Sequence, residues 1–196
     1  HWEGDLITGS RNKSAIGTLV ERTTRFTILL HLPDGHDAEH VQQAIIDKMQ
    51  HLPKLLRNSL TWDQGAELAL HKRIGASLDM AVYFCDPHSP WQRGTNENTN
   101  GLLRQYFPKG TDLSVYPEDY LDAVAEELND RPRKTLGYMK PSGKILELIN
   151  APTKRHTTGV ATTPRIRPSY QTKAARLRES WIVNGTRYHE PGEPGR

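Results

Sequence analysis

The order of strand-like and helix-like segments is the feature that most constrains the fold of this chain. Two segments rich in Val, Ile, Leu, Thr and Phe, at residues 15–21 and 24–31, indicate strands, and residues 2–7 look like a strand that precedes them. Only the dipeptide Arg22-Thr23 separates residues 15–21 from residues 24–31, which indicates a tight antiparallel connection. Helix-like and strand-like segments alternate afterwards, as in parallel β-α-β units. We therefore predict an α/β fold in which helices flank a mixed sheet.

The later elements follow from periodicity and from residues that stop helices. Asp37 opens a run whose apolar residues recur at helical spacing and which ends before Pro53. Two further short strands and three further helices complete the prediction, with strands at 60–62 and 81–85 and helices at 67–74, 95–106 and 118–129.

The last 46 residues differ in composition from the rest of the chain. In residues 151–196 Lys and Arg outnumber Asp and Glu by nine to three, and five prolines interrupt a segment with little apolar periodicity. Residues 1–150 carry the opposite balance, 17 basic against 20 acidic side chains. We expect residues 1–150 to form one domain and residues 151–196 to be a poorly ordered basic tail, with a short helix at most around 174–182.

Composition excludes several classes of protein. No apolar run approaches the roughly 18 residues of a membrane span, and the N-terminal residues lack the features of a signal peptide. The single cysteine, Cys85, rules out an intrachain disulfide and suits a reducing cytoplasm; we expect a buried thiol at the end of a strand rather than a nucleophile. A net charge of +3 and a pI of about 9.0 favour a nucleic-acid partner only weakly.

Three acidic residues stand where their chemistry is informative. Asp5 lies within the first apolar strand, Asp63 directly follows the strand at 60–62, and Glu97 lies on a later helix. A carboxylate in a buried strand is costly unless it is paired or binds a metal, and three neighbouring carboxylates are relieved by a divalent cation. Ligands that are all oxygen favour Mg²⁺ or Mn²⁺. Taken singly, each aspartate also fits a turn or cap, and Glu97 also fits solvated helix surface.

Four local sequences carry a resemblance to a known family: HWEGDLI at 1–7, LTWDQG at 60–65, the segment from Cys85 to Asp112, and LNDRPRKTLGY at 128–138. In this order they resemble the transposases of the insertion-sequence-thirty family, over roughly residues 1–150. That family belongs to the retroviral-integrase superfamily, so the resemblance implies a ribonuclease-H-like fold. Its signature is Asp, Asp and then Glu after 33 intervening residues, the separation found here between Asp63 and Glu97.

The resemblance implies a function and a set of site residues. Asp5, Asp63 and Glu97 would be the catalytic triad and would hold two Mg²⁺ or Mn²⁺ ions for DNA cleavage and strand transfer during transposition. The partners implied are element ends, target DNA and further copies of the chain in a synaptic complex. Four residues are candidates for contacting DNA: Arg93, Asn100, Arg104 and Lys109. Arg104 lies seven residues after Glu97, on the same face of a helix, although a plain surface arginine fits equally well.

Several other residues in these regions allow either a structural or a functional interpretation. Asn96 is expected to cap its helix. Glu67 and His71, four residues apart, fit either a supporting role beside Asp63 or an ordinary surface pair. His88 and Trp91 precede the helix of Glu97, where Trp91 is expected to pack rather than to stack on bases.

Two rival functions were weighed against the transposase. Paired carboxylates also serve glycosidases, but that class does not account for a third acid or for the segment 86–112. A truncated or inactive fragment that only binds DNA or a partner is the stronger rival. Full-length members of the family carry an N-terminal helix-turn-helix region, to which nothing here corresponds, and residues after about 151 do not resemble the family's ending.

Overall fold

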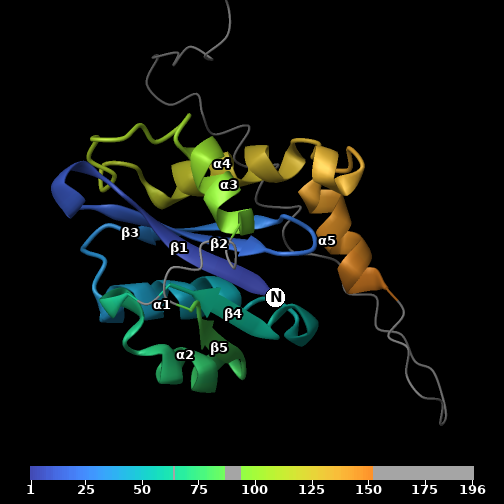
Figure 1. Cartoon of the computed structure of the whole chain (residues 1–196), viewed down its shortest axis with the longest axis horizontal. Helices are drawn as coiled ribbons and strands as arrows, with labels where there is room; N and C mark the ends of the chain where they lie inside the picture. The colour runs from blue at the N-terminus through green and yellow to red at the C-terminus, as the bar shows by residue number, and fades with distance from the viewer. Residues whose placement is uncertain (64, 87–93, 152–196) are drawn as a thin grey trace, which may run out of the picture. The chain divides into compact units, whose positions relative to one another are not determined.

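The computed structural model describes residues 1–63, 65–86 and 94–151. One five-stranded sheet organises them, with the strand order β3-β2-β1-β4-β5 (Figure 1). The strands are β1 (Trp2–Thr8), β2 (Ala15–Glu21), β3 (Thr27–Leu32), β4 (Ser59–Trp62) and β5 (Ala81–Phe84). Strands β1, β2 and β3 pair antiparallel, whereas β4 and β5 join parallel to β1 and to each other. The mixed α/β sheet predicted from the sequence is therefore confirmed.

Helices cover both faces of this sheet. They are α1 (Ala38–Met49), α2 (His71–Leu78), α3 (Gly94–Leu103), α4 (Glu118–Asp130) and α5 (Pro141–Asn150). One apolar core joins the sheet to α1, α2 and α5 and contains Trp2, Val41 and Ile74. A second core joins the opposite face to α3 and α4 and contains Ile7, Leu103 and Leu128. The central strands are thus enclosed between two layers (Figure 1).

The side chains of β1 alternate between these two layers. Trp2 and Leu6 pack in the core that includes α1 and α2, while Ile7 packs in the core that includes α3 and α4. Because side chains alternate along a strand, Glu3 and Asp5 share the face of Ile7. Two acidic side chains of the central strand are therefore directed toward α3.

The third strand begins later than predicted, at Thr27 instead of residue 24. A buried carboxylate, that of Glu21, accepts hydrogen bonds from the backbone N–H groups of Thr23 and Thr24 at 2.9 and 2.7 Å. Arg25 then takes a left-handed conformation with φ of 62°. Residues 22–26 consequently form a turn braced by Glu21, and the Thr-rich stretch that suggested a strand is used to build it.

The helix predicted at 67–74 is wrong in its boundaries. The structure has a 3-10 turn at Ala66–Leu68 and begins α2 only at His71. The Glu67 carboxylate folds back and accepts the indole N–H of Trp62 at 3.2 Å, so it does not lie in a continuous helix with His71. A Cβ at Gly65 would stand 2.0 Å from that carboxylate, so a larger residue there would require Glu67 to move.

Helix α5 was not predicted from the sequence. Its first residue is Pro141, and Ile145 is buried against the core that includes α1 and α2. Proline at the first helical position followed by an apolar run is a start signal that could have identified it.

The outer edge of β3 is covered by a side chain. Asn129 at the end of α4 accepts the Thr27 N–H and donates to the Thr27 carbonyl, both at 2.8 Å. Its amide thus supplies the hydrogen bonds that a further strand would make.

Two expectations from composition concern the described residues. Cys85 is buried and lies directly after β5, as predicted. None of the helices described here has the length and apolar character needed to cross a membrane. The expectations for residues 152–196 lie outside the described residues.

Candidate active site

Asp5 lies in the middle of β1 and is half-buried between the sheet and α3. Its Oδ2 accepts a hydrogen bond from Nδ2 of Asn100 at 2.9 Å, and its Oδ1 accepts the backbone N–H of Leu6 at the same distance. The hydroxyl of Thr18 on β2 donates to the Asp5 carbonyl at 3.2 Å. The carboxylate therefore has a fixed orientation at the interface with α3.

Asp63 follows the last residue of β4 and is exposed. Strands β1 and β4 run parallel, with Trp2 opposite Leu60 and Glu3 opposite Thr61. Continued two residues further, the same offset of 58 residues would bring Asp63, which directly follows β4, level with Asp5. The register of the neighbouring parallel strands thus leads the two aspartates toward the same level of the sheet.

Glu97 lies in the first turns of α3 and is exposed. The face of α3 turned toward the sheet carries the buried residues Asn96, Thr99 and Leu103. Glu97 stands three residues before Asn100, so the two are neighbours on the helix surface, and Asn100 contacts Asp5. The helix therefore holds Glu97 on the flank nearest to Asp5.

Polar contacts fix α3 along β1. Near its start, Oε2 of the buried Glu3 accepts the backbone N–H groups of Thr95 and Asn96 at 3.1 and 3.0 Å. Beside them, the hydroxyl of Thr18 donates to Oδ1 of Asn96 at 2.8 Å. Asn96 was expected to cap the helix, but its side chain instead binds the sheet and Glu3 receives the first N–H groups.

Arg104 binds the backbone instead of pointing away from the protein. Helix α3 ends at Leu103, shorter than predicted, and the half-buried Arg104 guanidinium donates to the carbonyls of Thr8 and Phe107 at 3.2 and 3.4 Å. These bonds join the residue after α3 to the end of β1. Two of its five N–H groups are occupied by protein, and a role in contacting DNA stays a prediction.

Contacts along α3 follow the order of residues in β1. Glu3 meets residues 95 and 96, Asp5 meets Asn100, and Thr8 meets Arg104. Five residues of strand span about 17 Å, and nine residues of helix span about 13 Å. The two elements therefore run side by side in the same direction, and α3 is held near both ends and beside Asp5.

The remaining candidates are dispersed. Lys109 is exposed in the segment after α3. The ring of His71 makes an edge contact with Phe84, at 4.9 Å between centroids, while Glu67 binds Trp62, so the two do not form the expected pair. Arg93, His88 and Trp91 lie outside the described residues.

The donor atoms at Asp5 suit a hard divalent cation. Asp5 and Asp63 present only oxygen ligands, and the buried Oδ1 of Asn100, beside Asp5, has no hydrogen-bond partner among the described residues. Among the described residues, no three side chains of His, Cys, Asp or Glu lie close enough together to form a metal site. The residues fit Mg²⁺ or Mn²⁺ in chemistry, and the convergence of all three carboxylates stays a prediction.

Sequence reasoning missed the residues that hold α3 in place. Glu3 is 1% exposed, and Thr18 and Asn96 are completely buried. A second acid two residues before Asp5 in an apolar strand was a usable signal, because it must share the face of Asp5. The partners Thr18 and Asn96 carry no such signal, since their contacts depend on how the helix packs.

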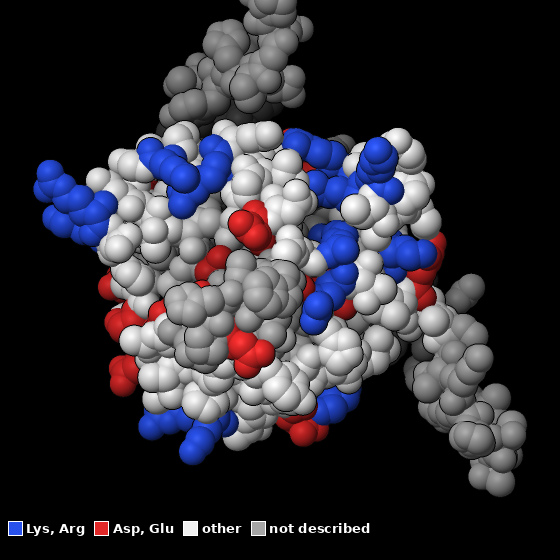
Figure 2. Space-filling view, viewed as in Figure 1, with Lys and Arg blue, Asp and Glu red and all other residues white. Residues whose placement is uncertain are grey.

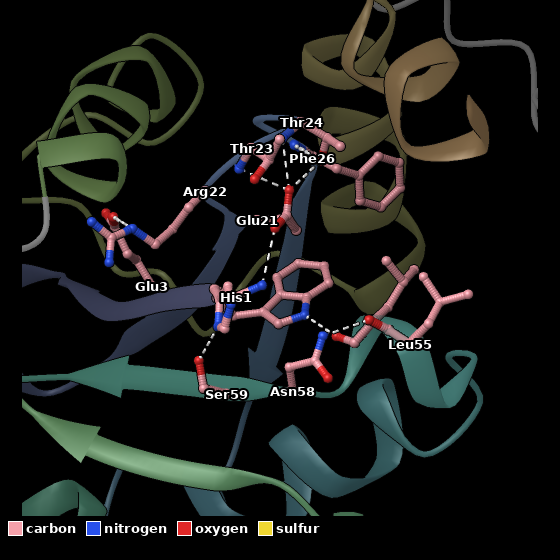
Figure 3. A network of polar contacts seen from close by, with 12 residues as sticks. His1, Glu3, Glu21, Arg22, Thr23, Thr24, Phe26, Leu55, Asn58 and Ser59 are labelled. Atoms are coloured by element: carbon pink, nitrogen blue, oxygen red, sulfur yellow. Dashed lines mark hydrogen bonds and ion pairs between the residues drawn. The ribbon is translucent and has the colours of Figure 1, made fainter. Parts of the chain in front are cut away.

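A second buried carboxylate, that of Glu21, lies at the turn after β2. Burial acts to raise the pKa of Glu21, but hydrogen bonds from the backbone and side chain of Thr24, together with the hydrogen bond and charge of the His1 ammonium group, outweigh it and leave the pKa below its usual value of 4.5. Figure 3 shows Glu21 directed toward Thr23 and Thr24, and Glu3 directed toward Arg22. The turn between β2 and β3 thus engages both buried acids.

Comparison with known proteins follows from this fold and these carboxylates. Residues 1–90 match the family described as integrase core domain. Two solved structures share the fold at 19% sequence identity. They are the catalytic core domain of BIV integrase, with a TM-score of 0.55 over 76% of this chain and 94% of that one, and a simian T-cell lymphotropic virus intasome chain, with 0.58 over 83% and 59%.

Sequence similarity narrows this class to bacterial transposases. The chain is 54% identical over 155 residues to the transposase for insertion sequence element IS1086 of Cupriavidus metallidurans, covering 79% of this chain and 45% of the relative. It is 59% identical over 147 residues to transposase InsI for element IS30C of Escherichia coli, covering 75% and 38%. The resemblance to the insertion-sequence-thirty family is confirmed. The chain spans less than half the length of these relatives.

Proposed function

We propose that this chain is the catalytic domain of a transposase of the DDE type, a polynucleotidyl transferase that cleaves DNA strands and joins them to a target. The observation that carries the proposal is the arrangement around Asp5. Asp63 directly follows β4, the parallel neighbour of the strand that carries Asp5, and Asn100, one turn after Glu97, donates to Asp5. The similarity to two transposases over more than 140 residues supports it.

The carboxylates of Asp5, Asp63 and Glu97 would together hold two Mg²⁺ or Mn²⁺ ions. Bound divalent ions supply charge neutralisation at the phosphate and activation of the attacking oxygen. The protein's part is placement. Asp5 is oriented by Leu6 and Asn100, and Glu97 is carried on a helix fixed to the same strand. Positioned charge of this kind is the main source of catalysis in phosphoryl transfer.

The substrate follows from the reaction class. Cleavage at an element end frees a 3′-hydroxyl, and attack of this hydroxyl on a target phosphodiester exchanges one phosphodiester for another without a nucleoside triphosphate. On the face in Figure 2, Lys and Arg side chains lie mainly across the upper part and right of the centre, while Asp and Glu lie near the centre and along the left edge. Basic side chains beside acidic ones suit a DNA backbone approaching the acidic residues, and we assign Arg104, Lys109, Asn100 and Arg93 to this contact.

Two further assignments rest on the same similarity. Pairing two element ends requires two active sites, so we propose that the protein acts as a homo-oligomer on DNA. A transposase works where the chromosome is, and we propose the bacterial cytoplasm as its location.

Plasmid cleavage tests the proposal. Supercoiled DNA is incubated with the purified chain in Mg²⁺, in Mn²⁺ and in EDTA. We expect nicking that requires the ion and that falls by more than about 100-fold in Asp5→Asn, Asp63→Asn and Glu97→Gln. Glu126→Gln is the matched control, because Glu126 is an exposed carboxylate on α4, and this variant should nick like the wild type.

A fragment that only binds DNA gives a different result. It would shift DNA in a gel without cleaving it in either ion, and all four variants would bind like the wild type. That outcome would contradict the catalytic proposal.

A further inference from the structure

Glu3 is a buried carboxylate on the same strand as Asp5, and the catalytic scheme leaves it unused. Only 1% of it is exposed. Its Oε2 accepts the N–H groups of Thr95 and Asn96, and its Oε1 pairs with Nε of Arg22 at 3.0 Å (Figure 3). Burying a charge is costly unless it is compensated, and these three donors provide the compensation.

The donors at residues 95 and 96 belong to the start of α3. The first four N–H groups of a helix have no partner within the helix, and the helix dipole makes that end positive. A carboxylate that accepts two of these groups forms charge-assisted hydrogen bonds, which are stronger than neutral ones. Glu3 therefore acts as a cap for α3 that is supplied by β1, a segment more than 90 residues away in sequence.

Helix α3 depends on such external contacts because its own sequence is a poor helix former. The ten residues GTNENTNGLL include two glycines, three asparagines and two threonines. Only Leu103 of this helix joins the buried apolar core, and the other buried residues, Asn96 and Thr99, are polar. Apolar burial contributes little at the start of α3, so polar contacts from the sheet determine its position.

We propose that Glu3 is a positioning residue that sets the place of Glu97 relative to Asp5 by fixing the start of α3 on β1. Glu3 and Asp5 lie two residues apart on one rigid strand, and Glu97 directly follows the N–H groups that Glu3 binds. An apolar side chain at position 3 would leave the N–H groups of Thr95 and Asn96 without this acceptor, so the start of α3 would lose its bond to β1. The effect on Glu97 rests on the proposed function.

The test compares Glu3→Gln and Glu3→Met with Asp37→Ala in the full chain. Gln keeps one acceptor oxygen without the charge, and Met keeps neither. Asp37 is the matched control, because its carboxylate accepts the N–H groups of Glu39 and His40 at the start of α1, in the layer on the other face of the sheet. Two quantities are measured: amide hydrogen exchange in α1 and α3, and Mg²⁺-dependent nicking per folded molecule.

We expect exchange of the first amides of α3 to rise about ten-fold in Glu3→Gln and further in Glu3→Met, while amides of β2 and β3 keep their protection. Nicking should fall about ten- to 100-fold in Glu3→Gln, the scale of a displaced catalytic group, and further in Glu3→Met. Asp37→Ala should raise exchange in α1 only and nick within about two-fold of the wild type.

The two readouts separate the possible failures. Unchanged α3 exchange in both Glu3 variants would overturn the proposal, as would faster exchange with undiminished nicking. If the wild-type chain does not nick DNA, the proposed function fails, and the exchange data alone still decide whether Glu3 fixes α3 to the sheet.

Discussion

Replacing Gly4 by alanine should destabilise the protein, although the same change in an ordinary strand does the opposite. Glycine inside a strand costs about 0.5–1 kcal/mol relative to alanine, because it loses more conformational freedom on folding. At Gly4, however, a Cβ would lie 2.1 and 2.2 Å from Cε3 and Cζ3 of Trp62. Trp62 is fully buried and directly precedes Asp63, so the ring cannot withdraw without moving β4.

The magnitude follows from this overlap. Both contacts are more than 1 Å shorter than the 3.4 Å at which ordinary van der Waals contact begins. Forcing one extra methyl into a packed core costs about 1–3 kcal/mol. For a domain of this size each kcal/mol lowers the melting temperature by roughly 2–4 °C, so a decrease of about 2–12 °C is expected.

A double-mutant cycle tests the stated cause. Thermal and urea unfolding are measured for the wild type, Gly4→Ala, Trp62→Leu and the double variant. Leucine lacks the ring atoms that meet the new methyl group, so Gly4→Ala should be neutral or stabilising in the Trp62→Leu background. Equal destabilisation in both backgrounds, or a stable Gly4→Ala single variant, would refute the reasoning.

Three further predictions concern the edge, the turn and the tail. Asn129→Ala should lower the free energy of unfolding, measured by urea titration, by about 1–3 kcal/mol, because the N–H and C=O groups of Thr27 lose their partners. The control Asn58→Ala, at an exposed asparagine, should change it by less than about 0.5 kcal/mol. The pKa of Glu21 is lowered in the folded state, so its ionised carboxylate contributes fully to stability above the usual pKa of 4.5, and this contribution is lost as the pH falls below that value. Glu21→Gln should therefore flatten the decline of the melting temperature between about pH 5 and 3. An unchanged slope would contradict this. We also propose that truncation after Asn150 leaves the melting temperature nearly unchanged but weakens DNA binding and its salt dependence, and a truncated chain that fails to fold would show that the domain boundary is misplaced.

The sheet could be predicted because its strands carry their own signals. Residues 15–21 and 2–7 are apolar and β-branched, and they lie in the structure almost as expected. Helix α1 could also be predicted, because Asp37 is a typical N-cap residue and its carboxylate accepts two N–H groups at the start of the helix. Boundaries failed where a carboxylate formed a local hydrogen bond. Glu21 accepts a backbone N–H before β3, and Glu67 accepts the indole N–H of Trp62 before α2.

The residues of the candidate site likewise include some that the sequence could indicate and some that it could not. Asp5 and Asp63 could be proposed from the sequence, because a polar residue in or after an apolar strand is conspicuous. The contacts of Glu3, Thr18 and Arg104 could not, because each joins segments more than 70 residues apart. Arg104 was expected to face DNA on the strength of its spacing from Glu97, yet spacing does not reveal that the helix ends at Leu103.

The most direct test of the account is the response of Asp63 to the metal. Thermal melts are recorded for the wild type and Asp63→Asn, each with and without Mg²⁺. An ion bound through Asp63 stabilises only the folded state, so the ion should raise the wild-type midpoint and leave that of Asp63→Asn unchanged. Asp63→Asn without Mg²⁺ should melt at or slightly above the wild type, because neighbouring carboxylates repel each other. An equal shift in both proteins, or no shift in either, would contradict a metal-binding role for Asp63.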